Sequence, residues 1–307
     1  MEINHVLESQ QFNREILFDL FKRADELRKN PSTSLNGKIL ATLFYEPSTR
    51  TRLSFESAMI RLGGKVVSTE NAKEFSSAIK GESIEDSIRV ISGYSDCIVM
   101  RHNKEGAAFI ASKVSKVPII NAGDGKGQHP TQAILDVYTI YKEIKRLDKL
   151  KIAMVGDLST GRTIRSLCYL LGKFNEIEII FVSPENLRIR GDIKEYLRKL
   201  NIKFTEEENL DEILPKVDVV YMTRIQKERM SLEDYGKADG KYVINKDNFE
   251  LINENSIIMH PLPHVEEIDL SIDVEERDRR IAYFRQAENG LYIRMALLDL
   301  ILNKKNS

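Results

Sequence analysis

The sequence has no tryptophan and only two cysteines, Cys97 and Cys168. Both cysteines lie in apolar segments without a CxxC or Cys/His spacing, which predicts free thiols packed in cores and not a disulfide framework. No stretch approaches the roughly 20 apolar residues of a membrane span. The N-terminus also lacks a basic region followed by an apolar run, the pattern of a secretory signal. We therefore expect a cytoplasmic protein that does not bind membranes.

An excess of charge of either sign is also missing. The 46 basic and 47 acidic residues give a formal net charge of −1, so nucleic acid is not an expected partner. Hydrophobic residues make up 42% and charged residues 30%, as in ordinary globular proteins. The length of 307 residues suffices for two domains of roughly 100–200 residues each.

Short apolar runs alternate with longer amphipathic ones, which predicts βαβ units and parallel sheets. One series of strands is expected at 39–45, 65–68, 97–100 and 117–120, and a second at 151–155, 177–182, 217–222 and 257–259. A long helix from 131 to about 147 joins the two series, and a last helix is expected from about 290 to 303. The expected fold class is α/β, with two doubly wound parallel-sheet domains. Ligands of such sheets bind beyond the carboxyl ends of the strands, so the polar segments there are candidate sites.

The first of these polar segments is FYEPSTRTR at 44–52, between a strand and a helix. The hydroxyl of Ser48 or Thr49 can cap that helix, which leaves backbone N–H groups beside the positive end of the helix dipole. Together with Arg50 these groups suit a phosphate. The alternative is simple helix capping with solvated arginines.

The second segment is NAGDGKGQHPTQ at 121–132. Its glycines predict a loop with unusual backbone angles, and Pro130 suits the first turn of the following helix. His129 and Gln132 are then three residues apart at the helix start and can address one ligand. A structural role for His129 is the alternative.

Two segments in the second series carry arginine. VGDLSTGRT at 155–163 is similar to G-x-x-x-x-G-K-[ST], but Arg162 replaces the lysine, so we reject a P-loop ATPase. A dinucleotide fingerprint, G-x-G-x-x-G, is absent there as well, and Arg162 would suit a carboxylate. In YMTRIQKER at 221–229, Arg224 and Gln226 are two residues apart, so both point the same way in an extended segment. A solvated charged loop is the alternative interpretation of this segment.

The last segment is MHPLPH at 259–264, where two prolines fix a turn whose carbonyls can accept hydrogen bonds from an amide NH2 group. A merely rigid loop is the alternative. No Ser-His-Asp order, metal-ligand cluster or nucleophilic cysteine competes with these segments. Phosphate-type and carboxylate-type sites on separate domains, with a histidine at the junction, suggest a transferase that uses a phosphorylated small molecule.

Three of these segments, STRTR, HPTQ and HPLP, resemble the carbamoyltransferase family in this order. The stretches 121–132, 222–229 and 260–263 resemble the aspartate carbamoyltransferases in particular, and the likeness runs from about residue 39 to the final helix. The closest alternative is an ornithine carbamoyltransferase, a family that typically has cysteine where this chain has Pro261 and lacks the Arg224-Ile225-Gln226 element. A catalytically silent carbamoyl-phosphate-binding chain is a further alternative, against which the intact arginines and His129 argue.

The resemblance implies the transfer of a carbamoyl group from carbamoyl phosphate to L-aspartate, an early step of pyrimidine synthesis, without a cofactor or a metal. It implies a carbamoyl-phosphate-binding domain at 1–131, on which a helix at 287–307 packs back, an aspartate-binding domain at 132–286, and the active site between them. It further implies a homotrimer with shared active sites. Any zinc-containing regulatory subunit would be a separate chain, because this one has no metal-binding cysteine cluster.

The resemblance also implies roles for individual residues. Those expected to hold the phosphate are Ser48, Thr49, Arg50, Thr51 and Arg101. Those expected to address the carbonyl oxygen are Thr51, Arg101 and His129, and the amino end is expected to meet Gln132 and the carbonyls of Pro261 and Leu262. The expected ligands of the aspartate carboxylates are Arg162, Arg224 and Gln226. Ser76 and Lys80 match a loop lent to the neighbouring subunit's site, where Lys80 would reach both substrates; the stretch 72–79 departs from the commoner pattern, and Lys80-Gly81-Glu82 anchors the match.

Overall fold

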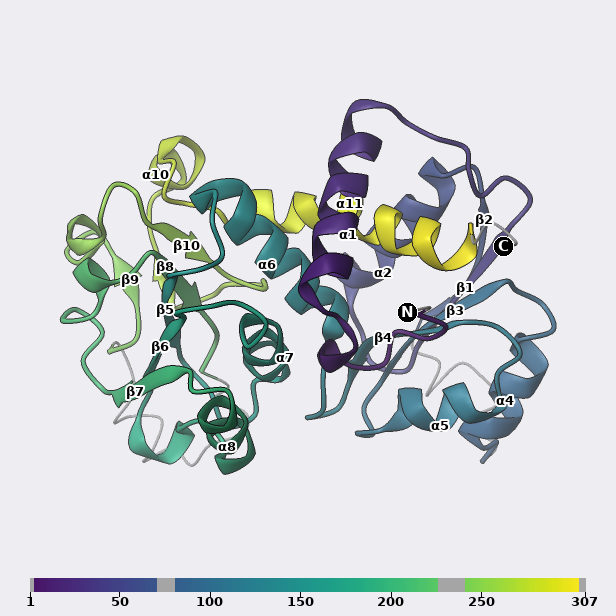
Figure 1. Cartoon of the computed structure of the whole chain (residues 1–307), viewed down its shortest axis with the longest axis horizontal. Coiled ribbons are helices and arrows are strands. Elements are labelled where there is room, and N and C mark those ends of the chain that lie inside the picture. The colour runs from purple at the N-terminus through teal and green to yellow at the C-terminus, as the bar shows by residue number, and fades with distance from the viewer. Residues whose placement is uncertain (1–2, 71–80, 226–240, 304–307) are drawn as a thin grey trace. The chain divides into compact units, whose positions relative to one another are not determined.

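A computed structural model describes residues 3–70, 81–225 and 241–303 of the chain (Figure 1). Ser76, Lys80 and Gln226 lie outside these described residues. The chain forms two compact units, residues 1–135 with 288–307 (unit 1) and residues 136–287 (unit 2). The long helices α6 (Pro130–Ile144) and α11 (Tyr283–Leu302) each contribute to both units. No helix within the described residues is long and apolar enough to cross a bilayer.

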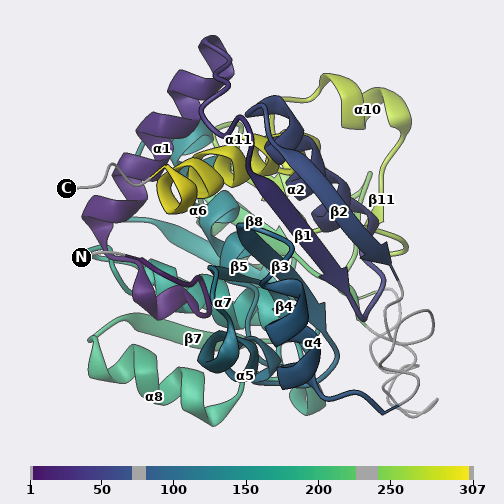
Figure 2. The same ribbon diagram turned by 90° about the vertical axis from the view of Figure 1, so that its right-hand side faces the viewer.

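Unit 1 is built on a parallel sheet in the order β2-β1-β3-β4 (Figure 2). The strands are β1 (Ile39–Phe44), β2 (Lys65–Glu70), β3 (Cys97–His102) and β4 (Ile119–Asp124). All four correspond to strands that the apolar runs predict. Because the chain runs from β1 outward to β2 and then returns to β3 on the other side, the strand order reverses between β1 and β3. That reversal is a topological switch point, where open α/β sheets bind their ligands.

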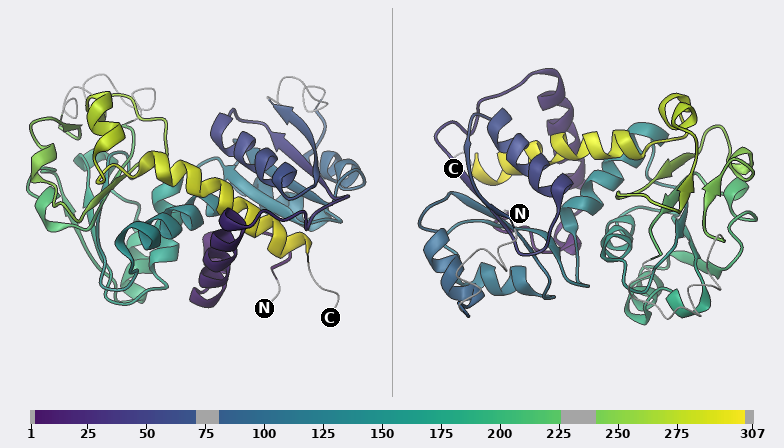
Figure 3. Two further views of the ribbon diagram at one scale, coloured as in Figure 1. Left: turned by 90° about the horizontal axis from the view of Figure 1, so that it is seen from above. Right: turned by 180° about the vertical axis from the view of Figure 1, so that it is seen from behind.

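Helices cover both faces of this sheet. On one face α4 (Ile84–Ile91) and α5 (Ala107–Val114) pack against a cluster that includes Leu43 and Met100. On the other face the hydroxyl of Thr42 in β1 donates to Glu56 of α2 (Thr49–Arg61) at 2.9 Å. The C-terminal part of α11 lies beside α2 and α1 (Arg14–Lys29) (Figure 3), where the Arg23 guanidinium meets Asp299 at 2.7 Å.

Unit 2 is built on a second parallel sheet, in the order β10-β8-β5-β6-β7. Its strands are β5 (Lys151–Val155), β6 (Glu178–Val182), β7 (Lys203–Glu207), β8 (Val219–Met222) and β10 (Ile257–Met259). The strand order reverses between β5 and β8, which is the switch point of this unit. Two doubly wound parallel α/β sheets are therefore confirmed as the fold class.

The remaining elements of unit 2 complete its two outer layers. On one face of the sheet are α7 (Arg162–Leu171) and α8 (Gly191–Lys199), joined by a hydrogen bond from the Tyr196 hydroxyl to the Tyr169 carbonyl at 3.1 Å. On the other face an apolar cluster unites Val155, Val220 and Ile258 with later segments of the chain. Those segments contain the paired short strands β9 (Ile244–Asn245) and β11 (Ile268–Asp269), and α10 (Ile272–Arg277). Short 3-10 turns elsewhere are η1 (Ser9–Gln11), η3 (Glu185–Leu187), η4 (Leu214–Lys216) and η6 (Phe249–Leu251).

Both cysteines are free and fully buried, Cys97 at the start of β3 and Cys168 in α7. Burial raises the pKa of each thiol far above its ordinary value, because a thiolate would lose its hydration. The expectation of two free thiols packed in cores is thus confirmed.

The predicted start of the last helix, at about residue 290, is wrong. The helix begins at Tyr283, and Gly290 lies inside it. A Cβ atom on Gly290 would lie 2.5 Å from Nη1 of Arg294 and 3.1 Å from Cδ2 of Leu135. A larger side chain at Gly290 would therefore crowd Arg294 of the same helix and Leu135 of α6, and the glycine does not mark a helix boundary.

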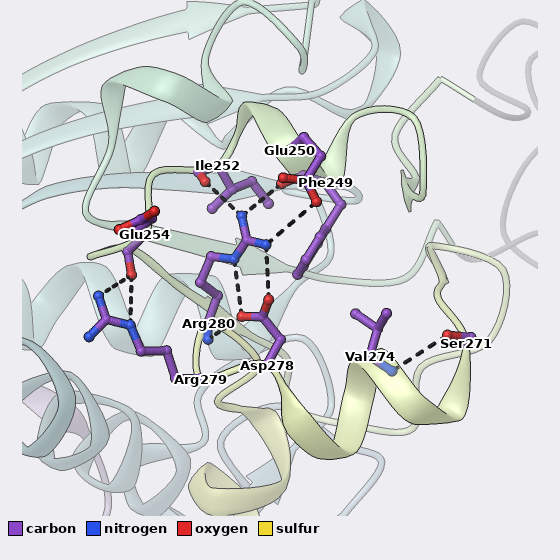
Figure 4. A network of polar contacts seen from close by, with 9 residues as sticks. All are labelled: Phe249, Glu250, Ile252, Glu254, Ser271, Val274, Asp278, Arg279 and Arg280. Carbon is purple, nitrogen blue, oxygen red and sulfur yellow. Dashed lines mark hydrogen bonds and ion pairs between the residues drawn. The ribbon is translucent and has the colours of Figure 1, made fainter.

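Arg280 fixes the segment that leads into α11. Figure 4 shows its guanidinium between the Asp278 carboxylate and two backbone carbonyls, those of Phe249 at 3.2 Å and Ile252 at 2.9 Å. The guanidinium carbon also lies 3.9 Å from the centroid of the Phe249 ring. The Arg280 carbonyl accepts the N–H of Ile258 in β10 at 2.7 Å, so the start of α11 is tied to that strand.

Candidate active site

The loop after β1 carries the hydroxyls predicted to hold a phosphate. Ser48 is the residue that precedes the first turn of α2, but its side chain makes no hydrogen bond to that turn. The prediction that the hydroxyl of Ser48 or Thr49 caps the helix is therefore wrong for Ser48, and Thr49 is already the first residue of α2. The first N–H groups of a helix have no partner within it, so both the hydroxyl and these amides remain available to an anion.

Arg50 and Thr51 follow in the first turn of α2. The Arg50 side chain makes no ion pair or hydrogen bond with any residue that the structure describes. Although much of this side chain is exposed, partial burial lowers the pKa of its guanidinium, which nevertheless stays positive at neutral pH. Thr51 is 6% exposed. A cation and a buried hydroxyl therefore stand on adjacent residues beside the positive end of α2.

Arg101 lies at the end of β3, on the other side of the switch point. It is in register with Phe44, the last residue of β1. Its Nε is 3.0 Å from the Glu46 carboxylate, and its Nη1 donates to the Ala122 carbonyl at 3.4 Å. Glu46, which the sequence reasoning did not single out, thus orients Arg101 at the edge where the 48–51 loop also begins.

His129 and Gln132 are positioned by the loop after β4. The carboxylate of Asp124 accepts the N–H of Gln128 at 2.8 Å and the N–H of Gly106 at 2.9 Å, which ties this loop to the one after β3. His129 then lies directly before α6, is 3% exposed and has Nδ1 3.4 Å from the Thr131 hydroxyl. Gln132 is 8% exposed in the first turn of α6. The predicted pair therefore occupies a rigid, nearly water-free position.

In unit 2 a close backbone contact positions both predicted arginines. Gly156 follows β5 with φ of 114°, and a Cβ atom there would lie 2.2 Å from the carbonyl oxygen of Thr223. The Thr223 hydroxyl donates to the Val155 carbonyl at 2.7 Å. The loops after β5 and β8 are thus held against each other, and they carry Arg162 and Arg224 at the switch point of this sheet.

The 157–162 loop turns its polar groups inward. Oδ1 of Asp157, which is 2% exposed, accepts the N–H groups of Ser159 and Thr160 at 3.1 and 3.0 Å. The two hydroxyls also donate to this carboxylate, at 2.9 and 2.5 Å. Arg162, the first residue of α7, is therefore the charged group that this loop presents.

Pro261 and Leu262 follow β10. Leu262 has φ of 56°, a backbone conformation that is strained for a branched side chain. Its N–H donates to Nδ1 of His260 at 2.8 Å, and His260 itself is 2% exposed. The loop is therefore held in its shape by buried protein groups.

The structure thus places the described candidate residues in two groups, each at the switch point or a neighbouring strand end of one sheet. The group in unit 1 is Ser48, Thr49, Arg50, Thr51, Arg101, His129 and Gln132. The group in unit 2 is Arg162, Arg224, Pro261 and Leu262. Asp124, Gly156 and Asp157 support them and stand in segments that the sequence analysis quotes. These features define an α/β protein with two parallel sheets, each with cationic and hydrogen-bonding groups at the carboxyl ends of its strands.

Comparisons with known proteins identify the family. Residues 4–142 match the model of the aspartate/ornithine carbamoyltransferase carbamoyl-P binding domain, and residues 148–301 match that of the Asp/Orn binding domain. A chloroplastic aspartate carbamoyltransferase of Arabidopsis thaliana is 55% identical over 98% of this chain and 78% of its own length. The solved catalytic subunit of Methanocaldococcus jannaschii aspartate transcarbamoylase is 50% identical, with a TM-score of 0.90 over 99% of this chain and 100% of that one. The chain therefore belongs to the aspartate/ornithine carbamoyltransferase family.

Proposed function

We propose that this chain is an enzyme that transfers the carbamoyl group of carbamoyl phosphate to the amino group of L-aspartate, giving N-carbamoyl-L-aspartate and phosphate. The observation that supports the proposal is a difference between two switch points that each carry two arginines: in unit 1 the Ser48 hydroxyl makes no cap bond to α2, whereas in unit 2 the hydroxyls of Ser159 and Thr160 both donate to Asp157. The solved aspartate transcarbamoylase of Trypanosoma cruzi in complex with carbamoyl phosphate and aspartate supports it; that protein is 38% identical, with a TM-score of 0.91 over 98% of this chain and 96% of that one.

In unit 1 we assign the phosphate of carbamoyl phosphate to Arg101 and to residues 48–51, the N-cap and first turn of α2. An incoming phosphate can use three groups here: the Arg50 side chain, the Ser48 hydroxyl and the first backbone amides of α2. The Arg50 side chain pairs with no described residue, and the Ser48 hydroxyl makes no cap bond to α2. Glu46 fixes Arg101 before the substrate arrives, so little ordering is left for binding. Thr51 and Arg101 are then expected near the oxygen that bridges carbon and phosphorus and near the carbonyl group of the bound substrate.

The reaction step is direct attack. The deprotonated amine of aspartate attacks the carbamoyl carbon and forms a tetrahedral oxyanion, which donors from Thr51, Arg101 and His129 stabilise as its charge develops. The bond to phosphate then breaks, and the departing phosphate can take the proton that the amine loses. Holding both reactants in line is worth roughly 7–11 kcal/mol of the barrier, which is why most of the named groups position the substrates.

In unit 2 we assign the aspartate carboxylates to Arg162 and Arg224, with Gln226 as the third ligand. Two guanidinium groups favour a substrate with two carboxylates and disfavour ornithine, whose side chain ends in an ammonium group. A steady-state assay tests this choice: we expect release of phosphate from carbamoyl phosphate with aspartate and none above background with ornithine. Turnover with ornithine at a comparable rate would show that the runner-up, an ornithine carbamoyltransferase, is right.

The assembly is the next part of the proposal: a homotrimer in which each site is completed by Ser76 and Lys80 of a neighbouring subunit. A head-to-tail interface that closes on itself gives a ring. Two variants, Lys80→Ala and His129→Ala, should each be nearly inactive, and mixing them after dissociation should restore part of the activity. No recovery in mixtures that contain hybrid trimers would mean that Lys80 serves its own subunit. Purification from the native source would reveal any separate zinc-containing regulatory chain.

We also place the reaction in the cytoplasm. The Arabidopsis relative is chloroplastic by its name, so the location is a property to test in its own right. Fractionation of the native cells, with the activity followed in the soluble cytoplasmic fraction, tests this part of the proposal.

A further inference from the structure

A buried chain of hydrogen bonds in unit 2 ends at the loop that contains Pro261 and Leu262. It begins at Tyr221 in β8, whose hydroxyl donates to Oδ2 of Asp136 at 2.7 Å. Oδ1 of Asp136 accepts from Nε2 of Gln286 at 2.7 Å, and Oε1 of Gln286 accepts the N–H of His260 at 2.9 Å. Asp136 and Tyr221 are 0%, Gln286 1% and His260 2% exposed, so water does not substitute for these partners.

The direction of this chain is fixed at Gln286. An ionised carboxylate only accepts hydrogen bonds, and both Gln286 and Tyr221 approach Asp136 with donors. The amide NH2 group of Gln286 must therefore face Asp136, which turns its oxygen towards the N–H of His260. If the amide were flipped, NH2 would face N–H and oxygen would face carboxylate, which would leave two pairs of like groups buried together.

From His260 the restraint continues to Leu262. Nδ1 of His260 accepts the N–H of Leu262, so Nδ1 is unprotonated and the ring proton is on Nε2. That nitrogen is 2.9 Å from Oε1 of Glu267, an oxygen that also accepts the N–H of Val265 at 3.2 Å. Burial alone would raise the pKa of Glu267, but the adjacent His260 ring and hydrogen bonds from backbone N–H groups hold that pKa below its ordinary value. The left-handed turn at Leu262 is thus restrained by His260 before it and by the contact of Val265 with Glu267 after it.

We propose that Gln286 is a positioning residue that sets the selectivity for a carbamoyl donor over an acetyl donor, by holding His260 and thereby the carbonyls of Pro261 and Leu262. This inference rests on the proposed function and on the role that the family resemblance implies for those carbonyls, as acceptors of the NH2 group of carbamoyl phosphate. Acetyl phosphate has the same phosphate and carbonyl but a methyl group in place of NH2. The two carbonyls can therefore distinguish the molecules only while the chain of contacts keeps them aimed at the ligand.

Competition binding to the full-length enzyme tests the idea with three probes: carbamoyl phosphate, acetyl phosphate and inorganic phosphate. Gln286→Met keeps the length of the side chain but removes both hydrogen bonds. We expect its affinity for carbamoyl phosphate to fall about ten- to hundredfold, while its affinities for the other two probes change less than about threefold. An equal loss for all three probes, or an unchanged ratio of carbamoyl to acetyl phosphate affinity, would overturn the proposal.

A second variant, Gln286→Glu, makes the ratio of carbamoyl to acetyl phosphate affinity depend on pH, which a loss of packing alone would not do. It places a carboxyl group against Asp136, and two such groups cannot both ionise, so the pKa of the pair is raised. At low pH the protonated carboxyl group introduced at position 286 keeps one donor and one acceptor, as the native amide has, and the carbamoyl preference should be close to that of the wild type. The preference should disappear as pH rises through the raised pKa, whereas the wild-type ratio should stay flat. A flat ratio in the variant would count against the proposal.

Arg285→Met is the matched control. Arg285 is the neighbouring residue of α11 and pairs with Glu143 at 2.8 and 2.9 Å, but none of its hydrogen bonds within the described part of the chain reaches the 260–265 loop. We expect this variant to lose stability and keep the wild-type ratio of affinities. The outcomes also separate the two proposals. A wild-type enzyme that does not carbamoylate aspartate contradicts the proposed function, whereas an active wild type with an unchanged ratio in Gln286→Met contradicts only the role of Gln286.

Discussion

The loops after β1 and β5 occupy equivalent places in their sheets and have similar sequences, PSTRT at 47–51 and LSTGRT at 158–163, yet they use their hydroxyls differently. In unit 2 the hydroxyls of Ser159 and Thr160 both donate to the buried Asp157. In unit 1 no such carboxylate among the described residues captures Ser48, whose side chain makes no bond to α2. The difference supports our proposal that unit 1 holds the phosphate, because a phosphate can accept from several donors while a carboxylate can be held by one guanidinium.

The comparison also gives a structural reason why we do not assign the phosphate to the loop at 155–163, although its sequence is similar to a phosphate-binding loop. Its first glycine, Gly156, leaves room for the close approach of the Thr223 backbone. Its Ser-Thr pair provides donors to the buried Asp157 carboxylate. Residue types alone therefore do not identify the ligand. What identifies it is which polar groups remain uncommitted after the loop has satisfied its own hydrogen bonds.

The largest expected effect concerns His129, which belongs to neither of the two loops compared above. It is buried and is part of neither the phosphate loop nor the arginine pair, so we assign it to the transition state. His129→Ala should lower kcat by roughly 10²–10³, the scale of one lost oxyanion donor, with a much smaller change in affinity for carbamoyl phosphate. Steady-state kinetics and direct binding measure the two quantities separately. A normal kcat with a raised KM would show that His129 is a binding residue.

The second prediction concerns Arg224 in unit 2 and tests whether this unit binds aspartate but not carbamoyl phosphate. Charge-assisted hydrogen bonds contribute roughly 1.5–3 kcal/mol each. Arg224→Ala should therefore weaken the apparent affinity for aspartate by about one to two orders of magnitude, at about tenfold per 1.4 kcal/mol. Binding of carbamoyl phosphate, measured by calorimetry without aspartate, should be nearly unchanged. Equal losses for both substrates would contradict the assignment of the two switch points.

Most of the fold could be predicted from the sequence because its central strands are continuous apolar runs, such as β1 and β8. The exceptions have physical reasons. The edge strand β7 alternates half-buried and exposed residues, so it has no such run and is absent from the expected strands. The helix α1 is absent from the expected helices although Leu17, Leu20, Phe21, Ala24 and Leu27 form a helical stripe there. This helical spacing is visible in the sequence, so α1 could have been predicted from it.

In the candidate site, the residues in loops after strands could be predicted from the sequence. The residues that hold those loops in place could be predicted only in part. Asp157 stands inside a quoted segment, and its local bonds to 159 and 160 could have been inferred from the spacing. Gln286 could not, because it lies 26 residues from His260 and 150 from Asp136, and only tertiary structure brings the three together.

The third prediction concerns Gly156, where the loops after β5 and β8 are in close contact. Gly156→Ala puts a Cβ atom against the Thr223 carbonyl at a positive φ, so we expect about 1–3 kcal/mol of destabilisation. Aspartate affinity should fall with it, because the Arg162 and Arg224 loops separate. Gly191→Ala is the control: Gly191 starts α8 with open space around it, so its unfolding free energy should be unchanged or slightly higher. Similar thermal melts for both variants would contradict the close-contact argument.

The smallest expected effect concerns Ser48. Serine at a helix N-cap usually contributes about 1 kcal/mol of stability, and its loss to alanine is normally seen in unfolding experiments. The Ser48 side chain makes no cap bond, so Ser48→Ala should leave the unfolding free energy nearly unchanged and weaken carbamoyl phosphate binding by about three- to tenfold, the scale of one hydrogen bond. Asn13 provides the opposite case, because its side chain accepts the Ile16 N–H of α1 at 2.9 Å. Asn13→Ala should therefore cost about 1 kcal/mol in urea unfolding without changing substrate affinity. If instead Ser48→Ala is as destabilising as Asn13→Ala and binds carbamoyl phosphate normally, the hydroxyl is a structural cap, and the contrast between the two loops loses its basis.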